Sequence, residues 1–198
     1  MPSRPRTLAI ALTVLGAVGL VASLSLAVDG WRALVAAADG VTDHVLACSI
    51  DETLDCAPAM ALWQAQILGF PNAYLGVGAF SVMVTSGVAM LAAAPQQLAR
   101  WFRLALLAGS GLGQVLVLFL MATTFTQLPA LCPWCTVIWI VMWPLLWLQV
   151  VDAVADAGSL VVPDGLARLV GRERWLLLAI GYVLAAAVGL AVMGPRVL

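Results

Sequence analysis

Long stretches without a charged residue divide the chain. Residues 7–28, 57–99, 104–151 and 175–195 contain no Asp, Glu, Lys or Arg. A helix needs about 20 apolar residues to cross a hydrocarbon core of about 30 Å. The first and last stretches each have the length of one span, whereas the two middle stretches are too long for one.

Helix-breaking residues decide how the first long stretch divides. Gly69, Pro71 and Asn72 separate a short apolar piece, 57–70, from a full span at 73–94. The short piece cannot cross a bilayer, so we expect a half-helix that dips into the interface.

Two prolines divide the second long stretch. Pro129 and Pro133 end one span and begin the next. Pro144 lies inside the later span, where neighbouring helices can satisfy the carbonyl that it frees. The five expected spans are 7–28, 73–94, 104–125, 132–151 and 175–194, with an outer loop and half-helix over 29–70.

The composition supports this interpretation. Hydrophobic residues make up 64% of the 198 residues and charged residues only 10%, against roughly 25% charged in soluble proteins. A soluble globule and a disordered chain are therefore excluded. The net charge of -1 provides no basic surface for nucleic acid. We predict one all-α, polytopic membrane domain over 1–198, in contact with lipid.

The arginines predict the orientation. With the N-terminus in the cytoplasm of a cell (inner or plasma) membrane, only Arg32 and Arg196 lie outside, which satisfies the positive-inside rule. The cytoplasmic arginines are then Arg4, Arg6, Arg100, Arg103, Arg168, Arg172 and Arg174. A cleaved signal peptide is the alternative for the first span, but its apolar run exceeds the usual 7–15 residues.

All four cysteines fall on the outer side in this topology or at its membrane boundary. They are Cys48, Cys56, Cys132 and Cys135. The outer compartment is oxidising, so disulfides form and persist there. The cysteines were not used to assign the orientation, so their placement supports it independently.

The most distinctive motif of the chain is the CxxC sequence Cys132-Pro133-Trp134-Cys135. Cysteines three residues apart share a helix face and can close a small disulfide ring. Pro133 suits the first position of a helix and places Cys132 at the cap, where free amide groups stabilise a thiolate. We expect a reactive dithiol at the mouth of a membrane helix, where a lipid-soluble quinone can accept two electrons.

The second pair, Cys48 and Cys56, brackets a polar segment of the outer loop. It can serve as a flexible relay that exchanges disulfides with the first pair, or both pairs can be inert staples. Four cysteines allow three pairings. A metal site is disfavoured because seven residues separate the loop pair. His44 can assist proton transfer or lie unused on the surface.

With this arrangement in view, the chain resembles the vitamin K epoxide reductase (VKOR) family, in particular bacterial homologues that oxidise DsbA-like thioredoxin-fold proteins. The resemblance rests on an early span, two loop cysteines, a half-helix, Asn72-Ala73-Tyr74-Leu75-Gly76 at the start of the second span, and a CxxC at the fourth. The family fold is a four-helix bundle around a quinone site. The fifth span resembles a peripheral helix of bacterial members, and we expect no fused thioredoxin-like domain.

The resemblance implies a role for each site residue. Cys135 would face and reduce the quinone, of menaquinone, ubiquinone or vitamin K type, and Cys132 would exchange with Cys56. Cys48 would meet the reduced DsbA-like partner, and Asn72 would hydrogen-bond a quinone carbonyl. No metal is implied.

Two positions depart from the family pattern. Trp139 stands where animal members have a tyrosine that contacts the head group, so an indole would pack there, and Leu62 stands where a serine is frequent. The sequence thus predicts a thiol:quinone oxidoreductase that supports disulfide formation outside the cytoplasm. The alternatives are a DsbB-like oxidase, in which the CxxC comes first, and a non-catalytic scaffold or small transporter.

Overall fold

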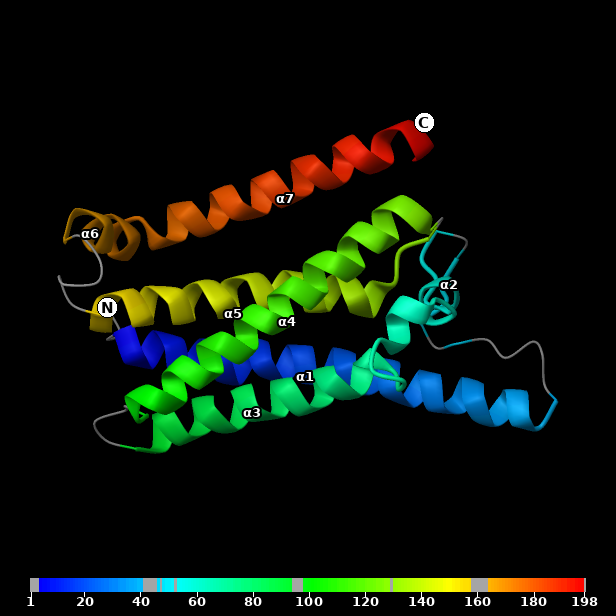
Figure 1. Ribbon diagram of the computed structural model, residues 1–198, viewed down its shortest axis with the longest axis horizontal. Helices are drawn as coiled ribbons and strands as arrows, with labels where there is room; N and C mark the ends of the chain where they lie inside the picture. Colours follow the sequence, from blue (N-terminus) through cyan, green and yellow to red (C-terminus); the bar gives the residue numbers. More distant parts are fainter. Residues whose placement is uncertain are drawn as a thin grey trace.

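The computed structural model describes residues 4–40, 46, 48–51, 53–93, 98–128, 130–157 and 164–197. These residues form an all-α protein whose long helices run roughly side by side (Figure 1). The helices are α1 (Arg4–Ala38), α2 (Ala57–Met60), η1 (Trp63–Gln66, a 3-10 helix), α3 (Asn72–Ala92), α4 (Arg100–Gln127), α5 (Pro133–Ala157), α6 (Asp164–Arg172) and α7 (Arg174–Val197).

Four helices in the described part of the chain, α1, α3, α4 and α5, are long and apolar enough to cross a bilayer. The fifth expected span falls within α7, a helix of 24 residues. Large apolar side chains cover the outside of the bundle, among them Leu112 at 75% and Val183 at 67% exposure. Lipid is the solvent in which such a surface is stable, and the protein is a multi-pass membrane protein.

Helix α1 is longer than the expected span. It continues to Ala38 and therefore includes Asp29, which the sequence placed in a solvated outer loop. The structure corrects this expectation, because Asp29 is only 3% exposed and lies on the helix face that carries Leu26 and Ala33.

The expected half-helix also differs. Residues 57–70 form two short pieces, α2 and η1, and a turn at Gly69, whose φ of 82° is accessible to glycine. Pro71 then precedes α3 directly.

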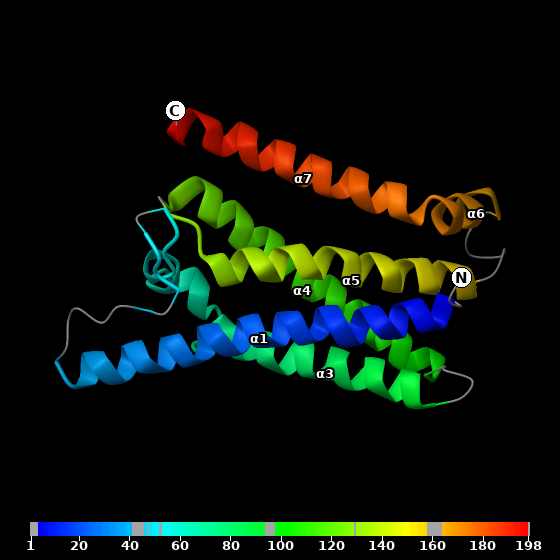
Figure 2. The same ribbon diagram turned by 180° about the vertical axis from the view of Figure 1, so that it is seen from behind.

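Helices α1 and α3 pack closely because small residues line their contact. A Cβ on Gly19 would overlap the ring of Phe80, and one on Gly87 would overlap Thr13. Small residues at helix contacts let membrane helices approach closely. Helix α1 also packs against α5, and α7 lies outside α4 and α5 in both views (Figures 1 and 2).

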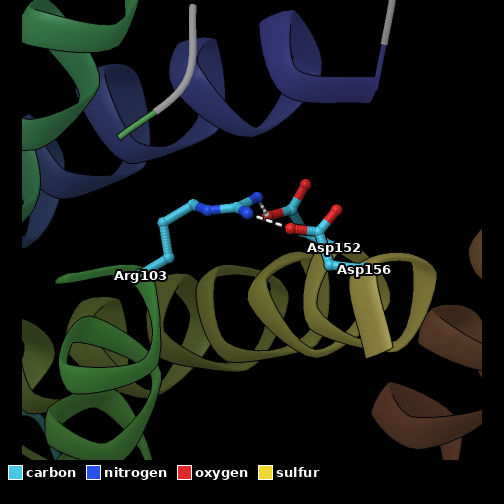
Figure 3. A network of polar contacts seen from close by, with 3 residues as sticks. All are labelled: Arg103, Asp152 and Asp156. Carbon is cyan, nitrogen blue, oxygen red and sulfur yellow. Dashed lines mark hydrogen bonds and ion pairs between the residues drawn. The ribbon is translucent and has the colours of Figure 1, made fainter. Parts of the chain in front are cut away.

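Polar contacts join α4 and α5 at the end of the bundle that holds the N-terminus. Arg103 of α4 contacts both Asp152 and Asp156 of α5, with 2.8 Å between the Arg103 and Asp152 atoms (Figure 3). Further along the same helices, the side-chain amide of Gln149 donates to the Ser110 hydroxyl at 2.9 Å. The two helices are thus fixed to each other at one end, and the short helices α2 and η1 lie at the other (Figures 1 and 2).

Candidate functional site

Two backbone hydrogen bonds place the outer loop against the start of α5. The amide of Leu131 donates to the carbonyl of Thr53 at 2.8 Å, and the amide of Asp55 donates to the carbonyl of Leu131 at 3.1 Å. The result is an isolated parallel bridge between Leu54 and Leu131. Each segment continues directly into a cysteine, so this bridge brings Cys56 beside Cys132.

Three sulfur atoms meet at this point. Cys48 and Cys56 form a disulfide, and the Sγ of Cys132 lies 3.0 Å from the Sγ of Cys56. Cys132 and Cys135 are free thiols. The structure therefore holds the loop pair oxidised and the CxxC pair reduced, with one sulfur of each pair in contact.

The sulfur cluster is shielded from solvent. Exposure is 3% for Cys48, 0% for Cys56 and 2% for Cys132. Leu26 of α1 and Leu46 are buried against these sulfurs, and partly buried Ala33 and Met60 pack around them.

The start of α5 supplies hydrogen bonds to the CxxC motif. The helix begins at Pro133, as the sequence predicts, and Cys132 directly precedes it. The backbone amide of Cys135 donates to the Sγ of Cys132 at 3.4 Å, and the amide of Thr136 donates to the carbonyl of Cys132 at 3.1 Å. Amides at a helix N-terminus favour negative charge on a nearby sulfur, so Cys132 is placed to act as a thiolate.

Asp51 closes the turn between the two loop cysteines. Its Oδ1 accepts from the amide and the hydroxyl of Thr53, at 2.8 and 2.7 Å, and from the amide of Leu54 at 2.9 Å. These bonds, the Thr53 hydroxyl first, hold the pKa of Asp51 below its ordinary value of 3.8.

Asp55 connects the two ends of this turn. Its Oδ1 accepts from the hydroxyl of Ser49 and from the amide of Ala57 at 2.9 Å. The Ser49 hydroxyl is the larger of the two causes that lower the pKa of Asp55 below 3.8. Both aspartates are charged at neutral pH and order the turn between Cys48 and Cys56.

A large cavity opens inside the bundle below the cysteines. Its volume is about 620 Å³, and helices α1, α3, α4 and α5 and the α2–η1 segment all contribute to its wall. Cys135, Cys132, Trp139 and Asn72 line it, and the rest of the wall is mostly apolar. Volumes of this size suit a small organic ligand held among apolar side chains with a few polar groups.

The comparison with known sequences decides the family. The family model for the vitamin K epoxide reductase (VKOR) family matches residues 10–150, a range that contains all four cysteines and the cavity. The chain belongs to the VKOR family. No curated protein matches the sequence.

Membership of the VKOR family indicates the general class of activity. The protein is a membrane oxidoreductase, since the family couples disulfide chemistry to quinones and generally uses a quinone as electron acceptor. The CxxC of this chain follows the loop pair, and the family match excludes the DsbB-like alternative. Among the described residues, no group of three His, Cys, Asp or Glu side chains gathers as metal ligands.

Asn72, at the start of α3, and Trp139, on α5, are the two predicted quinone-binding residues of this VKOR protein, and both line the cavity. The Asn72 side-chain nitrogen donates to the carbonyl of Gln64 at 2.7 Å, and its oxygen accepts from the amide of Ile67 at 3.3 Å. One N–H of the amide remains available to a ligand. The ring of Trp139 packs edge-on against Phe125, with 5.8 Å between centroids.

The structure also shows three buried polar residues that the sequence did not single out. The side chains of Ser23, Asp29 and Gln64 are at most 5% exposed, and each has one oxygen atom without a hydrogen-bond partner. Ser23 and Gln64 line the cavity. Nothing in the sequence marked them, because a serine in an apolar span usually bonds to its own helix. His44 lies outside the described residues.

Proposed function

We propose that this protein is a thiol:quinone oxidoreductase that reoxidises a DsbA-like thioredoxin-fold partner. Electrons pass through Cys48 and Cys56 to Cys132 and Cys135, and then to a quinone. The observation that supports this path is the 3.0 Å contact between the Sγ atoms of Cys56 and Cys132, together with Cys135 on the cavity wall.

The relay begins at the loop disulfide. A thiolate of the reduced partner attacks the sulfur of Cys48, and the Cys48–Cys56 bond breaks. The partner's second thiolate then displaces Cys48, so the partner leaves oxidised and the loop pair is reduced. The two electrons are now in the loop pair, and the partner's two thiol protons are on the loop thiols or in water.

Exchange with the CxxC motif follows at the contact point. The thiolate of Cys56 attacks Cys132 of an oxidised CxxC, and Cys135 leaves as a thiolate. Cys48 then attacks Cys56, which restores the loop disulfide and frees Cys132. This last arrangement, an oxidised loop pair beside a reduced CxxC, is the one that the structure holds.

The quinone step closes the cycle. Cys135 donates to the quinone in the cavity, Cys132 closes the Cys132–Cys135 disulfide, and the quinone takes up two electrons and two protons to become a hydroquinone. Amide groups near the developing oxyanion lower the barrier to this step, and Asn72 is the side-chain amide that we assign to it. Trp139 packs against the quinone ring.

We also propose that the cysteine end of the bundle faces outward and the N-terminus faces the cytoplasm. The arginine bias supports this orientation. The cluster that all four cysteines share also supports it, because α2 begins directly after Cys56 and lies at the end of the bundle remote from the N-terminus (Figures 1 and 2).

The purified full-length protein tests the proposal. Mixed with a reduced DsbA-like protein and a short-chain quinone, it should form hydroquinone in step with the partner's disulfide. Cys135→Ala should abolish hydroquinone formation, whereas Ser25→Ala, on α1 and off the cavity wall, should retain it. Hydroquinone formation that persists at the normal rate in Cys135→Ala would falsify the assigned electron path.

A further inference from the structure

Ser23 carries an unpartnered hydroxyl at the wall of the cavity, where α1 meets α3. The residue lies on α1, its side chain is 0% exposed, and it contributes to the cavity wall. Its Oγ has no hydrogen-bond partner. A Cβ on Gly76 would overlap this oxygen, so the glycine leaves space for the hydroxyl between α1 and α3.

Other hydroxyls in these helices behave differently. Thr13 and Ser25, which precede and follow Ser23 on α1, each donate to the carbonyl four residues earlier, at 2.9 and 3.0 Å. Thr123 and Thr124, which line the cavity from α4, do the same. A buried hydroxyl without a partner destabilises the protein. The exception at Ser23 therefore indicates a group from outside the chain.

The chemistry of the wall indicates what that group is. Most of the wall is apolar, so the occupant is mainly apolar, and the Ser23 hydroxyl requires a polar atom on it. A quinone carbonyl is an acceptor, and a serine hydroxyl can donate to it. Gln64 on the same wall carries a second unpartnered oxygen, on its side-chain amide, which can accept from a hydroquinone hydroxyl.

Ser23 is also close to the redox sulfurs along α1. It precedes Leu26 by one helical turn, and Leu26 belongs to the buried cluster that contains Cys56 and Cys132. Cys135 is packed against the same cluster. The hydroxyl therefore lies about one turn deeper in the bundle than the cysteines.

We propose that the Ser23 hydroxyl donates a hydrogen bond to a carbonyl oxygen of the bound quinone, which makes Ser23 a specificity-determining residue of the quinone site. This inference rests on the proposed function. The bond orients the head group and polarises the carbonyl while Cys135 and Cys132 supply the two electrons. Ser23 keeps its own proton over a full cycle, since the two protons of the hydroquinone come from the CxxC thiols or, where these are thiolates, from water.

The test compares Ser23→Ala with Ser25→Ala in the full-length protein. A small reductant such as dithiothreitol supplies the electrons, so the loop pair and the partner are not required. We expect Ser23→Ala to raise the KM for a short-chain quinone about three- to tenfold, the usual effect of one hydrogen bond, with little change in kcat. Ser25→Ala should behave as wild type.

Infrared difference spectra of a bound, isotope-labelled quinone give an independent measurement. In wild type, one carbonyl stretch should be shifted to lower frequency by the hydrogen bond, and Ser23→Ala should reverse the shift. A raised KM without that reversal would overturn the inference, as would wild-type values of both. If wild type forms no hydroquinone with any quinone, the proposed function itself fails, which is a different result.

Discussion

The amide of Leu131 donates to the carbonyl of Thr53, and this bond fixes where the two cysteine pairs meet. Cys132 follows Leu131 directly, and Cys56 lies three residues after Thr53. A contact between residues 76 positions apart in sequence thus depends on a bridge of two backbone hydrogen bonds and the disulfide in the loop.

Leu131→Pro should separate the two halves of the relay. Proline lacks the amide hydrogen that Thr53 accepts, whereas Leu131→Ala keeps it. We expect Leu131→Pro to lower hydroquinone formation at least tenfold when a DsbA-like protein supplies the electrons. Activity with dithiothreitol, which can reduce the CxxC directly, should remain near that of Leu131→Ala. Equal losses with both donors would show that the bridge does not serve the relay.

A variant with only Cys56 and Cys132 should form the intermediate disulfide of the relay. In Cys48→Ala/Cys135→Ala, the two remaining sulfur atoms start 3.0 Å apart, and mild oxidation should join them in most molecules. Mass spectrometry of a non-reduced digest measures the yield. The matched variant Cys56→Ala/Cys132→Ala keeps two cysteines whose sulfur atoms are not in contact, and its yield should be low. Similar yields would contradict the arrangement.

The turn between Cys48 and Cys56 should stay ordered in acid down to about pH 4, although thiolate-dependent exchange slows at higher pH. The pKa of Asp55 is lowered in the folded protein, first by the Ser49 hydroxyl and then by the Ala57 amide. A lowered pKa means that the stabilisation is complete above the ordinary value of 3.8 and is lost as the pH falls through the folded value. The pKa of Asp51 is lowered as well, so its contribution to stability is also lost only as the pH falls below 3.8.

Asp55→Ala removes this acceptor at every pH and should therefore reduce partner-dependent activity even at pH 7. Asp55→Asn keeps a side-chain oxygen and should retain more of the activity. The measurements are the hydroquinone rate of each variant at pH 7 and, for the wild type, the hydrogen-exchange protection of the Leu54 and Ala57 amides between pH 3 and pH 8. A loss of that protection centred above pH 5 would argue against Asp55 and Asp51 as its cause.

Arg103→Ala should destabilise the bundle at the end remote from the cysteines. Asp152 is only 14% exposed and would lose its partner (Figure 3), which we expect to cost about 1–3 kcal/mol. Thermal unfolding in detergent checks this. Arg172→Ala breaks the exposed pair with Glu173 and should shift the Tm much less. If both variants lower the Tm equally, the Arg103 contacts do not hold α4 to α5.

The helices could be predicted from the sequence because their cause is local. A charge in a bilayer core is costly, so uncharged stretches mark α3, α4 and α5 well, and Pro133 marks the start of α5. The same reasoning ended the first helix too early, just before Asp29. The structure buries that carboxylate on a continuing helix, and a single charged residue does not reveal whether its helix goes on.

The candidate site was predictable in its residues but not in its geometry. The cysteines stand out by type and spacing, whereas the bridge between Leu54 and Leu131 joins two backbone segments and leaves no side-chain pattern. Ser23 was missed for a similar reason, since its role depends on the missing bond to its own helix and on the space left by Gly76.

The burial of the loop disulfide limits which thiols can reduce it. A thiolate must reach a sulfur atom along the bond that it breaks, and Cys48 and Cys56 are 3% and 0% exposed. A small thiol such as glutathione is therefore kept away from the loop disulfide. On the proposed path, the loop pair would accept electrons only from a protein whose docking uncovers Cys48, and small thiols would enter only at the CxxC pair.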